Sequence, residues 1–527
     1  MLFTLPHSIA VLLLLVASPQ TLAQQHPEEF RIDLDAFSPV ELQKHHPENS
    51  AWLGGQPSFP SAGGEWGSTP ERPGSANVKA ATDSGKTDEV LSKIKAGTDS
   101  VSDDRYIVAM LQNITKEDID RHVQWVSNTL LNGGIIPPAL AKKFSGIATM
   151  FNSDVFKGYT AHLPPGIIHL IDQSELVRFV EKDQKINHAQ APKSNGSEDG
   201  SKFVSSSGFF MNVDDSSAAV QQYPPWGLDR ITHRQAGLKG VYVFPPDGGQ
   251  GVDIYILDTG INHKHPDFKG RARQGPTFSS NGLEDGNGHG THVAGIAASS
   301  TWGVAKAANI IGVKVLDNDG TGFVSQVVQG LEWSLLAVGN GTRRGVINMS
   351  LAGGGKSQAL DELVRKGREM GVPLSAAAGN DNINACDSSP SSSGAVMTVG
   401  ASDQQDKRAV FSNFGPCVNI FAPGTNITST YIPGSATATL QGSSMAAPHV
   451  AGIMAIFLSL YPEATADDVY TTVSKMATAG AVADSKDSTP ALLFSGMNAT
   501  RFADLYYQPG GSGWMNMVWQ TLQDSWI

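Results

Sequence analysis

The sequence predicts an α/β protein with a mostly parallel central sheet and helices on both faces, preceded by a small α+β domain. Over residues 222–497, short and nearly continuous apolar runs alternate with helical patterns, which is typical of a parallel sheet between two layers of helices. Over residues 105–187, a strand pattern is followed by a helical one twice. The length of 527 residues and the hydrophobic content of 40% allow each domain a core of its own.

The small domain is predicted from these two strand and helix pairs. Its strands are expected at residues 106–111 and 158–163, and its helices at residues 119–131 and 174–180. The periodicity is lost after residue 187, so the domain is expected to end there.

The large domain continues the alternation over a longer stretch. Its strands are expected at residues 252–257, 310–316, 346–349 and 372–378, and its helices at residues 323–338 and 358–370. Because helical segments rather than tight turns separate these strands, we expect the strands to run parallel.

The flanking segments are not predicted to form a folded core. Residues 1–23 are typical of a signal peptide, because an apolar run is followed by the small residues Thr21 and Ala23. Residues 24–104 are expected to form a low-complexity pro-region, residues 188–221 an exposed connector with a cleavage site, and residues 498–527 a C-terminal tail. No later stretch is expected to be long enough to span a bilayer, so the mature protein is predicted to be soluble. It is expected to be secreted or delivered to a vacuole.

Charge, cysteines and sequons bear on partners and compartment. The formal net charge of -12 argues against nucleic acid as the main partner. The two cysteines, Cys386 and Cys417, either pair, which would contribute about 3 kcal/mol, or remain buried thiols. A sequon at Asn348 lies in an apolar run and is expected to stay unmodified. Glycans are predicted at Asn113, Asn195, Asn340, Asn426 and Asn498.

A carboxylate ends the first predicted strand of the large domain. Asp258 follows the apolar run 252–257, and parallel sheets place their functional residues at such strand ends. A carboxylate in this position needs hydrogen-bond donors or a charged partner. Taken alone, Asp258 is either a catalytic residue or a cap at the end of the strand.

A glycine-dense segment, residues 285–292, leads into an apolar helix expected at residues 293–298. Its glycines allow the backbone to approach a substrate closely. His289, at the end of the loop, is the better proton carrier, whereas His292 is expected to be a hydrogen-bonded core residue. The alternative of a metal site at these two histidines lacks the glutamate and third histidine of a zinc-binding helix.

Residues 441–452 predict a turn that enters a buried helix, with Pro448 in its first turn. Ser444 stands at the start of this helix, where the positive end of the helix dipole and a free backbone N–H would face an oxyanion. The alternative is that Ser443 or Ser444 merely caps the helix.

Together the three segments resemble the subtilisin-like serine peptidases, in the order Asp, His, Ser. The resemblance covers residues 224–497 and is nearest to the fungal branch that includes proteinase K and the cerevisins. Residues 105–186 resemble the inhibitor-type prodomain of the same family. The matching motifs are residues 225–231, 258–261, 289–295, 350–354, 377–380 and 442–452.

The resemblance implies a mechanism and a mode of synthesis. Ser444 would attack the peptide carbonyl, His289 would transfer its proton, and Asp258 would orient His289. Asn380 would bind the oxyanion together with the Ser444 N–H. The enzyme would be a monomeric endopeptidase with an apolar or aromatic preference, made as a self-processing zymogen that its own prodomain inhibits, with no required cofactor. The implied substrate-backing residues are Ser350, Leu351, Ala352 and Gly353.

Three departures from the family pattern affect these expectations. Ser443 replaces a threonine but keeps a hydroxyl. Ala352 replaces a glycine, and its methyl group is expected to narrow the first specificity pocket or to change its preference. Asn419 replaces an aspartate of a calcium site, so calcium binding is left open and no metal ligand is predicted.

Other classes of protein fit less well. A lipase or esterase would need a closing glycine after Ser444, and the order of its triad differs. An inactive, scaffolding relative would have lost a triad or oxyanion residue, and all four are present. A furin-like processing peptidase would need a further β domain after residue 497, where the tail is too short.

Overall fold

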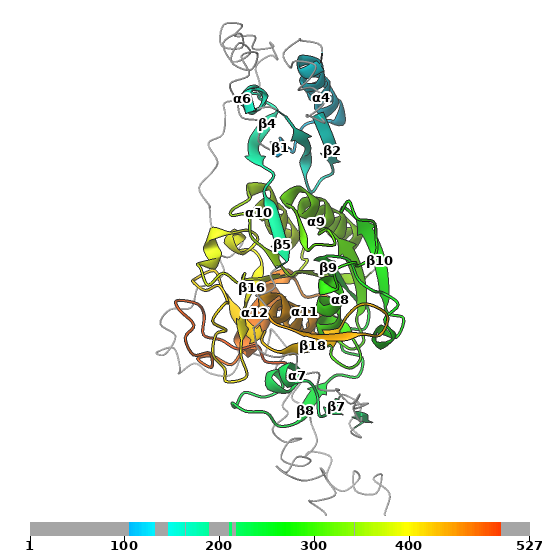
Figure 1. Ribbon diagram of the computed structural model, residues 1–527, viewed down its shortest axis with the longest axis vertical. Helices are drawn as coiled ribbons and strands as arrows, with labels where there is room; N and C mark the ends of the chain where they lie inside the picture. Colours follow the sequence, from blue (N-terminus) through cyan, green and yellow to red (C-terminus); the bar gives the residue numbers. More distant parts are fainter. Residues whose placement is uncertain are drawn as a thin grey trace, which may run out of the picture.

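We describe the protein from a computed structural model (Figure 1). The structure describes residues 105–131, 146–163, 165–188, 210–212, 218–341 and 343–496. The predicted signal peptide, pro-region and C-terminal tail lie outside the described residues, as do the sequons at Asn195 and Asn498.

The centre of the large domain is a seven-stranded sheet. Its strands are β9 (Val252–Asp258), β10 (Ala272–Thr277), β11 (Asn309–Lys314), β13 (Arg344–Met349), β15 (Leu374–Ala377), β16 (Met397–Ser402) and β17 (Ile420–Pro423). They lie in the order β10-β11-β9-β13-β15-β16-β17, and every neighbouring pair is parallel. The four predicted strands and the predicted fold class are therefore confirmed.

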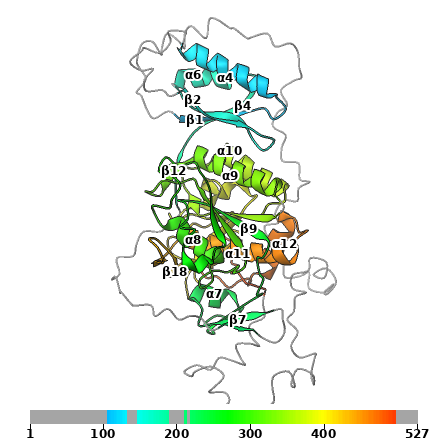
Figure 2. The ribbon, with the colours of Figure 1, turned by 90° about the vertical axis from the view of Figure 1, so that its right-hand side faces the viewer.

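Helices cover both faces of this sheet because its central strand is apolar on both sides. Ile254 and Ile256 of β9 pack with α8 (His289–Ala298) and α11 (Ser443–Leu460). Tyr255 and Leu257 pack on the opposite face with α9 (Val324–Gly339) and α10 (Gln358–Glu369). Figure 2 shows these two layers, with α9 and α10 on the side of the small domain. The helices predicted at residues 323–338 and 358–370 are confirmed.

Shorter elements complete the large domain. They are α7 (Trp226–Ile231), β8 (Val241–Phe244), η2 (Pro266–Phe268), β12 (Thr321–Phe323), β14 (Leu351–Ala352), η3 (Ala385–Asp387), η4 (Ser391–Ser393), β18 (Ile427–Thr430), β19 (Thr437–Leu440) and α12 (Ala466–Met476). A disulfide joins Cys386 in η3 to Cys417, with a Cα–Cα distance of 5.3 Å.

The small domain is a four-stranded antiparallel sheet with two helices. Its elements are β1 (Arg105–Met110), α4 (Lys116–Leu131), β2 (Gly146–Asn152), β3 (Lys157–His162), α6 (Pro165–Asp172) and β4 (Val177–Lys182), and the strand order is β2-β3-β1-β4. Val108 and Met110 of β1 pack against α4 and α6. Ile107 and Ala109 point the other way and join the cluster of α9 and α10, so the small domain docks on that layer of the large one.

One helix of the small domain was predicted in the wrong place. Residues 174–180 were expected to be helical, but residues 177–182 form β4, and the helix, α6, lies earlier in the chain. The apolar residues Leu176, Val177 and Val180 fit a helical spacing as well as a half-buried strand, and so short a segment does not separate the two periods. Pairing with β1 decides in favour of the strand.

The segment predicted as an aperiodic connector contains strands. His188 belongs to β5 (Lys185–His188), and further along lie β6 (Phe210–Asn212) and β7 (Ala219–Gln222). β7 pairs antiparallel with β8 of the large domain. These strands are only three or four residues long, so their pairing partners rather than their own pattern define them.

α11 corrects two further expectations. Among the described residues, it is the one helix that is long and apolar enough to cross a membrane, whereas no stretch after the predicted signal peptide was expected to be long enough. Within the protein, 89% of this helix is buried. Pro448 is its sixth residue and so lies in the second turn, not in the first. The core cluster shared with α8 and the sheet accounts for the apolar length of this helix.

Candidate active site

Asp258 and His289 form a buried hydrogen-bonded pair. Asp258 is the last residue of β9 and His289 the first of α8. Nδ1 of His289 lies 2.7 Å from Oδ1 of Asp258, and the two side chains are 1% and 0% exposed. A carboxylate at Nδ1 keeps a proton on that nitrogen and leaves Nε2 as the basic one. In the part of the chain that the structure describes, Nε2 has no hydrogen-bond partner.

Close backbone packing explains the glycines beside His289. Gly288 precedes α8 with a φ of 98°, a conformation that side chains disfavour. A Cβ atom on Gly290 would lie 2.1 Å from the carbonyl oxygen of Gly260. α8 therefore begins at His289, four residues before the expected start at residue 293, because Gly290 here serves a backbone contact rather than a flexible loop.

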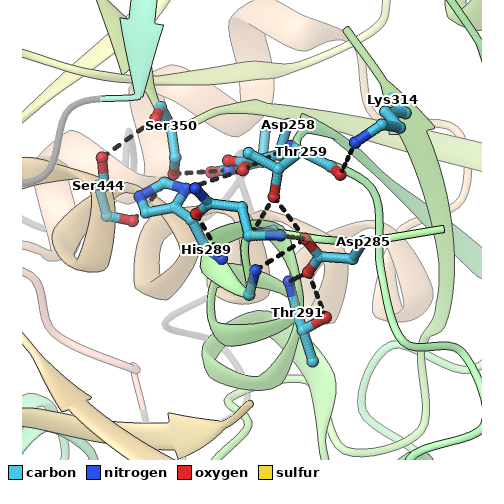
Figure 3. Close-up of polar contacts among 12 residues, drawn as sticks. Asp258, Thr259, Asp285, His289, Thr291, Lys314, Ser350 and Ser444 are labelled. Atoms are coloured by element: carbon cyan, nitrogen blue, oxygen red, sulfur yellow. Dashed lines mark hydrogen bonds and ion pairs between the residues drawn. The ribbon is translucent and has the colours of Figure 1, made fainter. Parts of the chain in front are cut away.

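Asp285 forms hydrogen bonds both to the segment that carries His289 and to the strand end that carries Asp258 (Figure 3). Its Oδ1 accepts from Thr259 Oγ1 at 2.9 Å and from the Gly288 N–H at 2.8 Å. Its Oδ2 accepts from the N–H of Thr291 at 3.0 Å and from the Thr291 hydroxyl at 2.5 Å. Asp285 was given no role from the sequence, although a carboxylate within a glycine-dense loop is a signal that backbone donors surround it.

Lys314 is a second residue that sequence analysis missed. It is fully buried at the end of β11, where its Nζ donates to the Thr259 carbonyl at 2.6 Å and to Asn318 Oδ1 at 2.9 Å. Burial lowers its pKa, against the opposing effect of Asp285 and other nearby carboxylates. The available signal was a single charge in an otherwise apolar strand.

Ser444 is the second residue of α11 and is fully buried. Its backbone N–H is one of the first four of the helix and has no acceptor within it. Its Oγ donates to the carbonyl of Ser350 at 3.0 Å. The fold thus brings the three predicted residues Asp258, His289 and Ser444 to one region at the carboxyl ends of the strands (Figure 3).

Asn380 is tied to the start of the same helix. Its Oδ1 accepts from the N–H of Ser443 at 2.8 Å. The Ser443 hydroxyl, in turn, accepts from the Gly379 N–H at 3.0 Å. A hydroxyl at position 443 therefore holds the segment of Asn380 beside Ser444, which explains why serine can replace threonine there.

The strand β5, which follows the sheet of the small domain in the chain, reaches this region (Figure 1). β5 lies between β12 and β14 and is antiparallel to both. Ala352 is opposite Asn187, and Leu351 is opposite His188.

The ring of His188 stacks on that of His289, with centroids 4.5 Å apart. Of the predicted substrate-backing residues, Leu351 and Ala352 thus flank a bound segment of the chain itself, and Gly353 follows with a φ of 118°.

The remaining candidate residues differ in exposure and in hydrogen-bond partners. The sequon residues Asn113, Asn340 and Asn426 are exposed, whereas Asn348 is fully buried in β13. Asn419 Oδ1 accepts from the Thr398 N–H at 2.8 Å. His292 is buried, and its Nε2 lies 3.0 Å from the carbonyls of Ile427 and Ala438, as expected of a core histidine. Over the described ranges, no three potential ligands among His, Cys, Asp and Glu come together to hold a metal.

An Asp–His pair beside a serine at a helix start, on a parallel sheet covered by helices, defines a serine hydrolase of the α/β class. Comparison with known protein families shows which family of serine hydrolases the chain belongs to. Residues 249–494 match the family described as the Subtilase family, and residues 105–189 match Peptidase inhibitor I9. The chain belongs to the subtilase family of serine peptidases and carries an inhibitor-type prodomain, as the resemblance implied.

Individual relatives agree with this family. The chain is 36% identical over 448 residues to "Subtilisin-like serine protease Pen c 2" of Penicillium citrinum, covering 77% of this chain and 91% of that protein. It is 36% identical over 445 residues to "Alkaline protease 2" of Aspergillus fumigatus, covering 77% and 84%. With "Cerevisin" of Saccharomyces cerevisiae it shares 41% identity over 384 residues, covering 68% and 56%.

A solved structure supports the fold of the large domain. The crystal structure of a cold adapted subtilisin-like serine proteinase matches with a TM-score of 0.50 and 41% identity. The match covers 52% of this chain and 98% of that one.

Proposed function

We propose that this chain is the zymogen of a secreted serine endopeptidase in which Asp258, His289 and Ser444 form the catalytic triad. The observation that carries the proposal is the buried hydrogen bond of 2.7 Å between His289 and Asp258, beside a serine at the start of a buried helix. The membership of the subtilase family adds the expectation of peptide substrates.

The reaction would proceed through an acyl-enzyme. The Ser444 hydroxyl, which donates to the Ser350 carbonyl, turns towards Nε2 of His289 and passes its proton to it while Oγ bonds to the peptide carbonyl carbon. The C–N bond then breaks as the same proton moves to the leaving amine. Water repeats the sequence to release the acid. Asp258 stabilises the imidazolium that forms in each half-reaction.

The tetrahedral oxyanion would be bound by the Asn380 amide and the Ser444 N–H. The Oδ1 of Asn380 is engaged by Ser443, which places the amide nitrogen at the opposite end of the group. Preorganised donors of this kind are typically worth about 10² to 10³ in turnover.

The specificity would favour apolar or aromatic residues before the scissile bond, with a limit set by Ala352. A Cβ atom on Gly379 would lie 3.5 Å from that of Ala352, so the added methyl group faces the segment that precedes Asn380. A library of peptides that differ at this one position would measure the preference, and equal rates for all residues would contradict it.

The prodomain would inhibit the enzyme until the connector is cut. β5 pairs with β14, which contains the predicted substrate-backing residues Leu351 and Ala352, and on its other side with β12. Cleavage after β5, within residues 189–221, would therefore free the large domain. We further propose that the protein needs no cofactor, acts as a monomer and is secreted or delivered to a vacuole, after removal of the segment predicted as a signal peptide.

The first test compares wild type with Ser444→Ala, both expressed in full length in a secreting host. We expect the wild type to shorten and to digest casein, with digestion blocked by phenylmethylsulfonyl fluoride, and the variant to do neither. Equal sizes and no digestion by either protein would favour an inactive, scaffolding relative instead.

A further inference from the structure

The two residues Ser350 and Ser444 exchange hydrogen bonds in both directions. The Ser444 hydroxyl donates to the main-chain carbonyl of Ser350 at 3.0 Å. The Ser350 hydroxyl donates to the main-chain carbonyl of Ser444 at 2.9 Å, and both residues are fully buried (Figure 3). The first hydrogen bond ends on the main chain of Ser350, which a substrate would also meet. It therefore does not explain the role of the Ser350 hydroxyl.

The Ser444 carbonyl needs this second contact because of a proline one turn later. In an α-helix a carbonyl accepts from the N–H four residues on, and here that residue is Pro448, which has no N–H. The proline ring also pushes the carbonyl four residues before it out of line. The proline therefore leaves the main-chain carbonyl of Ser444 without its helical donor. The hydroxyl of Ser350, which lies between β13 and β14, donates to this carbonyl instead.

Asn348 fixes the direction in which the Ser350 hydroxyl donates. Its Nδ2 donates to Ser350 Oγ at 2.9 Å, so it occupies a lone pair of that oxygen. The hydroxyl proton is then available to the Ser444 carbonyl. Asn348 and Ser350 are the first and third residues of the buried sequon, so in the fold this motif serves a hydrogen-bond chain.

We propose that the Ser350 side chain is a positioning residue that sets the start of α11, and with it the Oγ and the N–H of Ser444, for attack and for oxyanion binding. This inference rests on the proposed function, because it takes Ser444 as the nucleophile. Loss of the hydroxyl leaves the carbonyl unpaired in the core, and the first turn of α11 shifts to find another donor.

The expected effect falls on turnover rather than on substrate binding. The main chain of Ser350, which would pair with a substrate, is unchanged in Ser350→Ala. A misplacement of about 1 Å costs on the order of 10²-fold in rate. We therefore expect kcat to fall about ten- to a hundredfold while KM stays within about twofold, and Ser350→Thr, which keeps the hydroxyl, to recover most of the loss.

The decisive test is a double-mutant cycle with Pro448→Ala. This change returns an N–H to the position from which a regular helix would serve the Ser444 carbonyl. Ser350→Ala causes a certain fold-loss in kcat in the wild type. In the Pro448→Ala background we expect that fold-loss to be at least about fivefold smaller. Equal losses in both backgrounds would overturn the proposal, as would a kcat within twofold of wild type for Ser350→Ala.

Ser375 provides the matched control. It is also buried, lies on the neighbouring strand β15 and donates to a carbonyl of α11, that of Ala447, at 2.9 Å. That carbonyl has a regular helical donor in Ala451, so we expect Ser375→Ala to keep kcat within about twofold of wild type. A loss in Ser375→Ala as large as that in Ser350→Ala would show a general packing effect and overturn the specific role.

Active sites are counted with a fluorophosphonate probe, so that unfolded or unprocessed protein does not enter kcat. The rate of labelling of Ser444 also reports nucleophile reactivity directly, and we expect it to fall with kcat in Ser350→Ala. Absence of labelling in the wild type would refute the proposed function itself. Labelling of the wild type and Ser350→Ala at equal rates would refute only the inference about Ser350.

Discussion

Gly290 lies where an added side chain would disturb the packing between Asp258 and His289. A methyl group there would meet the carbonyl oxygen of Gly260 at 2.1 Å and would also contact Asp258. The first turn of α8 would have to move away from the end of β9, which separates His289 from Asp258. We expect Gly290→Ala to lose at least about 10²-fold in kcat/KM towards a peptide substrate.

The control for this prediction is Gly339→Ala at the end of α9. Its added methyl group would meet only the flexible end of Met370, at 3.2 Å. Activity within about twofold of wild type is expected, since alanine is favourable in a helix. A Gly290→Ala enzyme that retains full activity would show that α8 can shift without disturbing the proposed triad.

His188 makes the affinity of the prodomain dependent on pH. Its ring is half-buried against His289, and burial, assisted by the charge of His289, lowers the pKa of His188 to about 4. Asp258 and Asp319 face the same ring and oppose this shift. In the released prodomain the ring titrates near the ordinary value of about 6.5. Protons therefore bind more readily to the released form.

The complex should accordingly weaken as the pH falls from about 6.5 towards 4, by at most about tenfold per pH unit, and should be fully stable above this range. The inhibition constant of the small domain added to the mature enzyme measures this between pH 7 and pH 4.5. The variant His188→Gln has no titrating ring, so its curve should be flatter. Parallel curves for the two prodomains would contradict the prediction.

At the scale of elements, the small domain supplies caps to two helices of the large one. Asp183 accepts from the N–H of Ser325 at 2.8 Å and from its hydroxyl at 2.6 Å, at the start of α9. Glu181 accepts from the Ser357 hydroxyl at 2.6 Å and from the N–H of Gln358 at 2.7 Å, at the start of α10. Carboxylates are favoured at these ends by the unpaired N–H groups and the helix dipole.

Removal of one such cap should loosen the prodomain without changing Asp258, His289 or Ser444. We expect Asp183→Ala to raise the inhibition constant of the small domain about ten- to a hundredfold, because a charge-assisted contact of two bonds is lost. The matched change Asp172→Ala, at an exposed position of α6, should leave the constant within about twofold. Equal constants for the two variants would show that apolar packing alone holds the prodomain.

At the scale of the whole molecule, the disulfide ties a peripheral cluster to the sheet. Cys386 and Cys417 are 31 residues apart, and Cys417 packs against a small apolar cluster that includes Val418 and, in β17, Phe421. The double variant Cys386→Ser/Cys417→Ser should lose about 3 kcal/mol of unfolding free energy, because the unfolded chain regains the freedom of that loop. Denaturant unfolding of the mature enzyme measures the loss, and a reducing agent should destabilise only the wild type.

Much of the fold could be predicted from local pattern. The strands β9, β11, β13 and β15 are continuous apolar runs, and α9 and α10 show a clear helical period, so each was placed within a few residues. β4 and β5 could not be placed, because such short segments become strands only through their partners β1, β12 and β14. The start of α8 was missed because Gly290 indicates a flexible loop when it is considered without Gly260.

The sequence by itself determined the type of each chemical group and its local setting: a carboxylate at a strand end, a histidine among glycines and a serine at a helix start. Tertiary structure alone decided which groups meet. Residues 31 positions apart form the Asp258–His289 pair, Asp285 joins its two segments, and the Ser350 hydroxyl reaches the carbonyl that Pro448 leaves free. The physical reason is that periodicity is a property of neighbouring residues, whereas such contacts depend on the register of strands and helices far apart in the chain.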